Sequence, residues 1–556
     1  MATVNLSKAK RICTQFKKLK ADRGNWETWW QDLSKYCIPR SAQVTTKKES
    51  GTQFDKDVYD STARDSVKIF AAGLMGHLTN PSLPWFKLRS QDDAIMEAEG
   101  VRAFFSTAEK KIRSVFHDSN FYQQLHEFYL HIGVFGTSVF YSEADAQDLI
   151  RYYARPIREI FFEEDERGRL RSVYRLFELT ALQAFEKWGS EAGKEIAKSI
   201  EKKEYNKTFE FIHYSGPRDV RDPKKQDKKN MEIESVWVNV TDEKKVDEGG
   251  FKEQPFSIAR FSKEPQEKHG YSPCMDVLPD IKSANRQKYN MLRAAAKAID
   301  PAILLPHENF VLPLDFNPSA VNYKQQATGA GSDEKIEVWG YQGDWNIGRD
   351  SLLDDREIIK RGLFTDMFLM LMDKDKRMTA REVQERVAEK MFILGPVLGR
   401  LQSELLEPVI TRTFNLLLRD GHFGEVPEAL IQTADGYKIE YLGQLAKAQK
   451  LAELRSIEGF LTSIQGIAQL DPNVIHKVDT DATVDEIADI LGMDPKLLRD
   501  PKDVQKLREE IARQKEMAMK VQLAQGAGDA GQSVGKAGQE LNKMDNEGGE
   551  RGTAAK

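Results

Sequence analysis

Two helical segments joined by a short charged loop, over residues 350–419, constrain this chain more than any other stretch. Apolar residues three, four or seven positions apart give each segment one apolar face, from Leu352 to Met370 and from Val383 to Val409. The second helix, with about 40 residues, would span about 60 Å, which exceeds the width of a small domain. We therefore expect it to leave its own domain, to pack on neighbouring subunits, or both.

The joining loop, residues 372–378, contains five consecutive charged residues. Thr379 and Glu382 follow it as a capping-box sequence, in which each side chain can accept a hydrogen bond from the other residue's amide. Pro396 and Pro408 lie inside the long helix. We predict a kink there, because proline removes a backbone hydrogen bond and its ring crowds the preceding turn.

Composition sets broad limits on the class of protein. The 556 residues suffice for several domains' worth of core, and the net charge of −5 does not predict tight, nonspecific nucleic-acid binding. Three widely spaced cysteines, Cys13, Cys37 and Cys274, lack metal-ligand spacing, which is typical of free thiols in a reducing compartment. We find no signal peptide and no apolar run of about 20 residues, and therefore expect a soluble protein made inside the cell.

The region before residue 136 is predicted to be α-rich. Helical patterns cover 6–37, 60–76, 93–117 and 120–134, and a short strand is expected at 85–89. Three tryptophans share one face of the first helix, namely Trp26, Trp29 and Trp30. We interpret them as a core or subunit-contact stripe, because a nucleic-acid stacking platform would require exposed rings.

From Gly136 the apolar period changes to two, which predicts a β-rich region over 136–261. Its strands are expected at 138–142, 150–154, 159–163, 169–179, 208–213, 233–240 and 256–261, with a helix at 180–188. The turn at 165–168 ends in glycine, which favours a tight hairpin. The basic run 218–229 could touch phosphate, but a solvated hairpin loop is the preferred interpretation.

A new helix is predicted to begin after Gly270, with Ser272 as its cap and Pro273 in its first turn, and to end near Ile299. Residues 301–349 are predicted to form a small β insertion before the helix–loop–helix element. After Arg419 we expect a loop, a short strand at 439–442 and helices at 444–469 and 484–520. The tail, 521–556, has a composition typical of disorder.

A search for catalytic chemistry gives no candidate. Phosphate-binding, zinc-protease, paired-cysteine and nucleophile-elbow motifs are absent from the sequence. Residues 526–531 match a glycine-rich dinucleotide pattern, but they follow no predicted strand and lie in the low-complexity tail. The nine histidines show no metal-ligand pairing with carboxylates. We therefore predict no enzyme activity, no cofactor and no metal site.

The charged loop is the remaining candidate site. In a monomer it would be a solvated turn. In a ring with its loops pointing inward, three cations would form stacked positive rings that hold passing phosphates weakly and without base specificity, namely Lys374, Lys376 and Arg377. The neighbouring Asp373 and Asp375 would keep that hold weak.

Several short motifs, in this order, resemble the portal (head-to-tail connector) proteins of short-tailed double-stranded DNA bacteriophages, the podovirus type. They span most of residues 1–470: Asp60-Ser-Thr-Ala, Ala71-Ala-Gly-Leu, Trp85-Phe86, Gly270-Tyr-Ser-Pro, Leu278-Pro-Asp-Ile, Asn285, Thr379-Ala-Arg-Glu-Val, Leu394-Gly-Pro-Val-Leu-Gly-Arg-Leu-Gln402, Glu404 and Pro408.

The resemblance implies an α+β, mainly α, portal fold that assembles into a dodecameric ring with a central channel. In the terms of that family, the segments would be a wing (1–270), stem helices (271–300 and 350–371), a clip (301–349), a tunnel loop (372–378), a kinked long helix returning to the wing (379–439), a helical crown (440–520) and a disordered tail (521–556).

The resemblance also implies a function without enzymatic activity. Such a ring occupies one capsid vertex of the virion, nucleates procapsid assembly in the host bacterial cytoplasm, and passes genomic DNA during packaging and ejection. Its implied partners are eleven further copies, double-stranded DNA, the terminase large subunit, major capsid and scaffolding proteins, a tail adaptor and internal core proteins, without direct membrane contact. A scaffold-like virion protein and a DNA-processing enzyme remain as alternatives at this point.

Overall fold

The computed structural model describes residues 7–41, 43–46, 51–96, 98, 100–222, 224–225, 227–299, 302–304, 337–339, 345–369, 394–432, 437–442, 454, 456–465, 467, 477–491 and 504–517. The chain divides into two compact units, Met1–Arg455 and Ser456–Lys556. Within the described residues the fold is α+β and mainly helical, as predicted.

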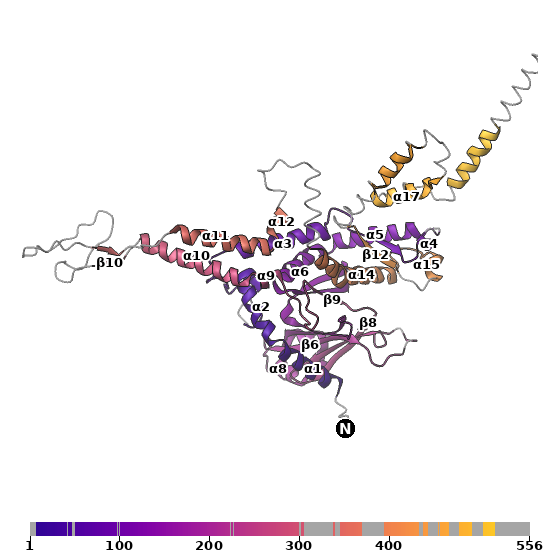
Figure 1. Cartoon of the computed structure of the whole chain (residues 1–556). Helices are drawn as coiled ribbons and strands as arrows, with labels where there is room; N and C mark the ends of the chain where they lie inside the picture. The colour runs from indigo at the N-terminus through magenta and orange to yellow at the C-terminus, as the bar shows by residue number, and fades with distance from the viewer. Residues whose placement is uncertain are drawn as a thin grey trace, which may run out of the picture. The chain divides into compact units, whose positions relative to one another are not determined.

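The first predicted helix, 6–37, is wrong as one element, because the chain forms α1 (Lys8–Asp22) and α2 (Gly24–Cys37), separated at Arg23 (Figure 1). The guanidinium of Arg23 is buried and donates to the carbonyl oxygens of Ile157 and Ile160, at 2.9 and 2.6 Å. This long-range bonding lies where the two helices meet and could not be read from local periodicity. A short 3₁₀ turn, η1 (Pro39–Ser41), follows α2.

The helical part of the first unit contains α3 (Thr62–Leu78), α5 (Val101–Asp118) and α6 (Phe121–Phe135). The predicted helix 93–117 is wrong as one element, because a short α4 (Asp93–Met96) is separated from α5 by Gly100, whose φ is +78°. Both predicted short strands are confirmed: β1 (Phe86–Ser90) pairs antiparallel with β12 (Tyr437–Tyr441).

A three-stranded antiparallel sheet continues the main core of the first unit. Its order is β3 (Leu149–Arg155), β2 (Thr137–Asp145) and β9 (Phe256–Arg260). Large buried side chains from the helices and this sheet form one core cluster, including Trp30, Phe70, Phe116, Phe121, Phe128, Tyr129, Phe140 and Tyr152. Trp30 therefore lies in the core, as predicted, and its indole nitrogen donates to the Phe135 carbonyl at 3.0 Å.

A second, five-stranded antiparallel sheet forms the rest of the β region. Its strands lie in sequence order, beginning after the 3₁₀ turn η2 (Ile157–Glu159): β4 (Ile160–Glu164), β5 (Leu170–Thr180), β6 (Thr208–Pro217), β7 (Ile233–Asn239) and β8 (Lys244–Phe251). The sequence did not predict β8, which is an edge strand rich in charge and glycine. Charged residues on an edge strand discourage pairing with other chains. They also remove the apolar alternation by which a strand is predicted from sequence.

The two faces of this sheet carry different helices. The apolar side of α1 covers one face through Ile12 and Phe16, against Ile212 and neighbouring strand residues. On the other face lie α7 (Ala181–Trp188), the 3₁₀ turn η3 (Gly189–Ala192) and α8 (Lys194–Glu201), which pack against Phe211. Ile212 and Phe211 are adjacent in β6, so strand alternation sends them to opposite sides.

After the sheets the chain forms α9 (Pro273–Asp276), α10 (Leu278–Ile299), β10 (Ala302–Leu304), β11 (Glu337–Trp339), α11 (Trp345–Gly362) and α12 (Thr365–Leu369). The β10–β11 pair confirms strand structure in the predicted insertion. The predicted start of the next helix at residue 350 is wrong by five residues, and the predicted single segment 350–371 breaks at Phe364, whose φ is +57°.

The long second helix is described from residue 394. Residues 394–401 are helical, a π turn follows at Gln402–Leu406, and α14 (Glu407–Arg419) completes the helix. A short α15 (Glu428–Gln432), which was not predicted, precedes β12.

The second unit contains helical residues 456–465, α17 (Thr480–Leu491) and helical residues 504–517. Arg508 pairs with Asp481 at 2.6 Å between its last two helices. The predicted crown, 440–520, spans the boundary of the two units, and the tail 521–556 lies outside the described residues.

Candidate functional site: the α10–α11 hairpin

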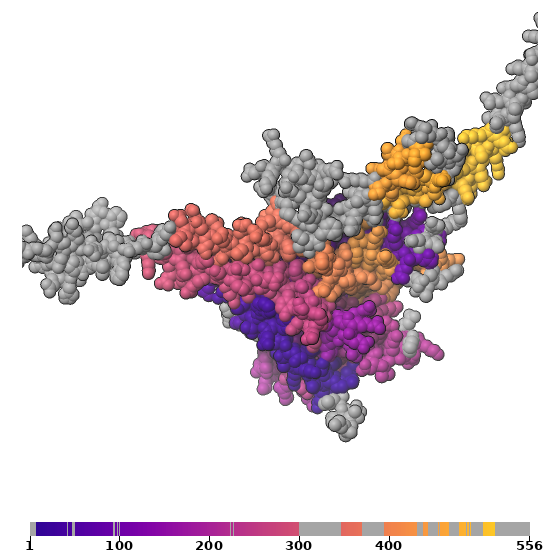
Figure 2. Space-filling model, in the orientation of Figure 1, coloured from indigo at the N-terminus to yellow at the C-terminus, as the bar shows by residue number. Residues whose placement is uncertain are grey.

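Helices α10 and α11 form a long helical hairpin, here called the hairpin (residues 278–299 and 345–362). They lie side by side (Figures 1 and 2). The antiparallel β10–β11 pair lies between the end of α10 and the start of α11 in the sequence. The side-chain amide of Gln287 crosses between them, donating to Ser351 Oγ at 3.1 Å and to Asp355 Oδ2 at 3.0 Å.

The start of the hairpin is fixed to the core by a helix cap. Ser272 Oγ accepts a hydrogen bond from the Met275 amide at 3.1 Å and donates to the Val134 carbonyl at 2.8 Å. Pro273 occupies the first turn of α9. The predicted cap is therefore confirmed, and its additional bond to the end of α6 sets where the hairpin begins.

One face of the hairpin is buried against its own chain. This inner face consists of Leu278, Ile281, Ala284, Leu352 and Ile359, together with Leu363 directly after α11, each no more than 6% exposed. The end of α11 lies so close to the residue before α10 that a Cβ on Gly362 would collide with the Val277 side chain. Burial of such side chains contributes about 1.5–3 kcal/mol each, so the inner face holds the hairpin to the body of the unit.

Polar contacts reinforce the same end of the hairpin. Arg356 Nε and Nη2 both donate to Asp60 Oδ2, at 2.8 and 2.6 Å, and Asn285 Oδ1 accepts from the Tyr59 amide at 2.6 Å. Burial opposes ionisation of Asp60, but hydrogen bonds from Thr62 and Arg356 outweigh it and lower the pKa of this carboxyl. These contacts, here called the clasp, tie α10 and α11 to the loop that precedes α3.

The part of the hairpin that its own chain leaves uncovered also carries apolar side chains. This uncovered surface, here called the outer face, includes Leu292, Ile299, Ile347, Leu353 and Ile358, which are 45–85% exposed. Single exposed apolar residues are ordinary, but five on one hairpin favour a contact with another molecule. Leu353 and Ile358 directly neighbour the buried Leu352 and Ile359, and helix geometry places them on opposite flanks of that buried stripe.

The two helices also differ in charge. Helix α10 carries one acidic residue, Asp280, and five basic ones, Lys282, Arg286, Lys288, Arg293 and Lys297. Helix α11 carries four acidic and four basic residues. Its acidic residues cluster within two turns, namely Asp350, Asp354, Asp355 and Glu357. A basic helix therefore lies beside a helix that has an acidic cluster but no net charge.

The predicted charged-loop residues cannot be placed in this hairpin. Lys374, Lys376 and Arg377, and the capping pair Thr379 and Glu382, lie outside the described residues. Pro396 lies within the helical residues 394–401.

The described break in the long helix falls at the π turn. There the amide of Glu407 donates to the Gln402 carbonyl, one residue farther back than in an α-helix, directly before Pro408. The wider turn accompanies the loss of the amide at Pro408, because proline cannot supply the next backbone hydrogen bond.

Side chains from two strands hold the π turn. Glu404 accepts from the backbone amide of Arg260 at 2.9 Å and from its Nη2 at 2.6 Å, and the Tyr441 hydroxyl donates to the Gln402 carbonyl at 3.2 Å. Arg260 is buried and also pairs with Glu164. The break in the helix is therefore stabilised by contacts with residues of β9 and β12 as well as by the proline.

Downstream of the turn, α14 is bonded firmly to the sheet of the main core. Arg412 Nε donates to the Ser142 carbonyl at 3.1 Å, and the hydroxyls of Thr413 and Tyr152 lie 2.9 Å apart. Burial lowers the pKa of Arg412, while Glu253 beside it acts in the opposite direction.

Sequence reasoning did not identify the roles of Arg260 and Arg356. Asp60, Asn285 and Glu404 belong to the motifs that carried the family resemblance, and each proves to be a partner in one of these two polar clusters. The motifs could have indicated that these three residues matter. The residues to which they bond lie 144 to 296 positions away along the chain, so the motifs could not identify them.

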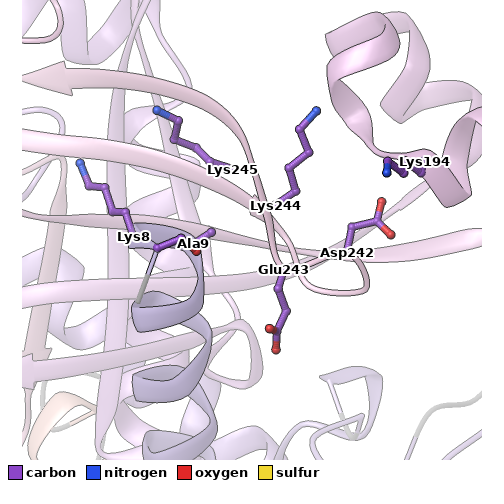
Figure 3. Close-up of a pocket in the computed structure, with 8 residues that line it drawn as sticks. Lys8, Ala9, Lys194, Asp242, Glu243, Lys244 and Lys245 are labelled. Atoms are coloured by element: carbon purple, nitrogen blue, oxygen red, sulfur yellow. The ribbon is translucent and has the colours of Figure 1, made fainter. Parts of the chain in front are cut away.

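A cavity of about 600 Å³ lies elsewhere, at the start of α1 and α8 (Figure 3). Four lysines line it, yet Lys8 pairs with Glu234 and Glu248, and Lys244 pairs with Glu191. Its positive charges are thus largely neutralised by the protein itself, and it does not present a built anion site.

The part of the chain that the structure describes contains no candidate metal site and no candidate membrane-spanning helix. No group of three or more His, Cys, Asp or Glu side chains there could hold a metal ion. None of the described helices combines the length and apolar character needed to cross a membrane.

Comparisons with known proteins cover almost the whole chain. The family model described as bacteriophage head to tail connecting protein matches residues 9–498. A probable portal protein of Bordetella phage BPP-1 is 27% identical over 536 residues, which are 95% of each chain. A portal protein of Salmonella phage epsilon15 is 28% identical over 536 residues, covering 94% of this chain and 95% of the relative.

Proposed function

This chain belongs to the family of bacteriophage head-to-tail connecting proteins, and on that basis we propose that it is the portal protein of a phage virion. It forms the ring at one capsid vertex through which genomic DNA enters during packaging and leaves during ejection. Both similar phage proteins bear portal names and match this chain over nearly their full length. The function is structural, and no enzymatic step is assigned to the chain.

The single observation that best supports a ring is the apolar outer face of the hairpin. Leu353 and Ile358 are 51% and 45% exposed in the isolated chain, beside fully buried neighbours. In the proposed ring, the outer face of one copy packs on the next, and the basic side of α10 meets the acidic cluster of α11. A head-to-tail contact of this kind closes into a ring when its rotation divides a full turn, and we propose twelve copies.

The segments take the places that the family resemblance implies. We assign the wing to 1–270, the stem to 271–300 and 350–371, the clip to 301–349 and the crown to 440–520. The start of α11 at Trp345 moves the stem boundary into the range first given to the clip. In this arrangement the stem is the hairpin, and its inner face joins it to the wing.

The tunnel loop, 372–378, is the proposed DNA-contacting element. Lys374, Lys376 and Arg377 would form three positive rings in an assembly that is otherwise net negative, because each copy carries −5. Negative walls repel DNA and favour sliding, while a few cations supply weak local contact with phosphates.

Thr379 and Glu382 would cap the helix that returns from the channel. Pro396 would contribute to its bend together with the π turn at Gln402–Leu406, and α14 would end the return on the wing.

The partners follow from the proposed position at a capsid vertex. They are the other copies in the ring, double-stranded DNA, the terminase large subunit that drives packaging, the major capsid and scaffolding proteins, a tail adaptor at the clip, and internal core proteins on the capsid side. Assembly takes place in the cytoplasm of the host bacterium, and the finished ring resides in the virion.

Negative-stain electron microscopy of the purified full chain tests the assembly. We expect twelve-fold rings with a central hole. Particles that remain monomers or dimers at micromolar concentration, in low salt and in high salt, would rule out the ring.

Replacement of Lys374, Lys376 and Arg377 together by alanine tests the loop. Rings should form normally, while the amount of DNA packaged or retained per particle should change. Replacing three exposed lysines of α1, Lys10, Lys18 and Lys20, provides a charge-matched control away from the loop. Equal packaging and retention in wild-type and triple-variant particles would remove the loop from the mechanism.

A further inference from the structure

Two contacts inside the hairpin fix which residues of α10 lie level with which residues of α11. At its root, Val277, directly before α10, lies against Gly362, the last residue of α11. Farther out, the Gln287 amide bonds to both Ser351 and Asp355. Both contacts fit two antiparallel helices of equal rise, so each step outward along α10 is matched by one step back along α11.

One face of α10 is a row of exposed cations, here called the cationic row. Arg286 and Arg293 are both exposed, and each guanidinium lies 5.7 Å from the centre of the Tyr289 ring between them. Neither arginine has an ion-pair partner among the residues that the structure describes. The two arginines lie about 100–120° around α10 from Gln287, the residue that bonds to α11. The cationic row therefore faces away from α11.

The matching face of α11 is acidic and lies on the other edge of the hairpin. This acidic row consists of Asp350, Asp354 and Glu357, all exposed, and lies about 110° around α11 from the side that contacts α10. Glu357 pairs with Arg361 at 2.9 Å. Asp350 Oδ1 lies 3.5 Å from Arg349 Nε, which leaves Asp354 without an ion-pair partner among the described residues.

We propose that Arg286 of each copy pairs with Asp354 of the next copy, an inference that rests on the proposed ring and names the residues of its contact. In a ring whose axis runs along the hairpin, residues that are level within one hairpin are also level between neighbouring hairpins. The two internal contacts place Arg286 level with Asp354. Arg293 then lies about 4.5 Å along the axis from Asp350, within reach of its long side chain.

The apolar outer face surrounds this pair. Leu353 and Ile358, which are 51% and 45% exposed, flank the acidic row on either side. Their burial in the same contact removes water and so strengthens the attraction between the two charges. The apolar area supplies the larger part of the association free energy, while the charges decide which edge meets which and at what height.

Charge reversal with rescue tests the pairing in the full chain. Arg286→Glu and Asp354→Arg each place like charges opposite one another. Each should raise the concentration at which half of the rings dissociate by about tenfold or more at low salt. The double variant restores opposite charges and should return that concentration to within about threefold of wild type. Sedimentation velocity over a dilution series measures all four proteins.

Lys10→Glu on α1 is the matched control, because it makes the same charge change at an exposed residue outside the hairpin. It should leave ring dissociation unchanged. Single variants that behave like this control, or a double variant that dissociates as readily as the single ones, would overturn the pairing while wild-type rings still support the proposed function. A wild-type chain that forms no rings would overturn the proposed function and the pairing together.

Discussion

The inner and outer faces of the α10–α11 hairpin have similar apolar residues but opposite surroundings. Leu352 and Ile359 are buried at 3% and 1% exposure, whereas their immediate neighbours Leu353 and Ile358 are half exposed. Helix geometry places Leu353 and Ile358 on opposite flanks of the buried Leu352–Ile359 stripe, so the apolar surface of α11 extends beyond that stripe on both sides. A helix with so wide an apolar surface is typical of one that is buried on more than one side, and the chain itself covers only the inner part.

This difference separates what stabilises the subunit from what is available for assembly. The apolar side chains of the inner face are buried within one copy, and the clasp residues Asp60 and Arg356 pair with each other there. The outer face gains its stabilisation only when a second surface removes it from water. Substitutions on the two faces should therefore affect different measurements, and the following predictions run from the largest expected effect to the smallest.

The largest effect is expected for Ile359→Ala on the inner face. It removes buried methyl and methylene groups and leaves a cavity, which should lower the free energy of unfolding by about 2–5 kcal/mol. Ile358→Ala is the matched control and should change it by no more than about 0.5 kcal/mol in the dissociated chain. Urea denaturation at low protein concentration measures both. Equal losses of unfolding free energy in the two variants would contradict the distinction between the inner and outer faces.

The next effect concerns assembly rather than folding. Leu353→Ser and Ile358→Ser should each weaken the contact between copies by about 1.5–3 kcal/mol, because each loses the apolar area that the ring would bury. Sedimentation velocity should show a shift from rings to free subunits, while the dissociated chains unfold at the wild-type urea concentration. Unchanged ring formation in the double variant would exclude the outer face as the subunit contact.

A smaller effect is expected at the clasp. Asp60→Asn keeps the shape but removes the charge that Arg356 binds, which should cost about 1–2 kcal/mol of folding stability near neutral pH, since Arg356 is partly reached by water. Because the pKa of Asp60 is lowered in the folded state, its stabilising contribution is complete above its ordinary pKa of 3.8. That contribution is lost as the pH falls through the lower, folded-state pKa.

The difference in stability between wild-type protein and Asp60→Asn should accordingly shrink as the pH is lowered below about 4. Urea midpoints measured between pH 3 and pH 7 provide the check. A difference that stays constant over this range would mean that the charge of Asp60 contributes nothing beyond its hydrogen-bonding shape.

The smallest effect is expected for Lys282→Ala. Its ammonium pairs with Asp32 at 2.7 Å, but both side chains are 42–49% exposed. Water and salt screen such a pair, so the change in unfolding free energy should stay below about 1 kcal/mol and should decrease further in 0.5 M NaCl. A loss as large as that of Ile359→Ala would show that surface charge, rather than apolar burial, holds the hairpin to the unit.

Local sequence pattern predicted most of the architecture, because apolar period and turn residues act over a few positions. The β4 and β5 strands on either side of Gly168, the cap at Ser272, and the β1 and β12 strands were all predicted from such signals. The same reasoning missed β8 and joined α1 to α2, because an edge strand shows little apolar alternation and the buried Arg23 draws its partners from residues more than 130 positions away.

The candidate site was predicted less completely than the fold. Periodicity identified Leu352, Ile359 and Leu363 as one face, but it gave no indication that Leu353 and Ile358 would be left exposed. The clasp and the Arg260–Glu404 pair join residues far apart in the chain, which no local pattern reports. The resemblance to portal proteins implied what periodicity could not, an assembly in which this element packs between neighbouring copies.

A cryo-electron microscopy map of the assembled full chain tests the proposed ring contact most directly. We predict a closed ring of about 760 kDa, from twelve chains of 63.4 kDa, with a central channel. In it, Leu353 and Ile358 each lie buried against a neighbouring copy. A ring in which both side chains face solvent, or a chain that forms no ring, would contradict it.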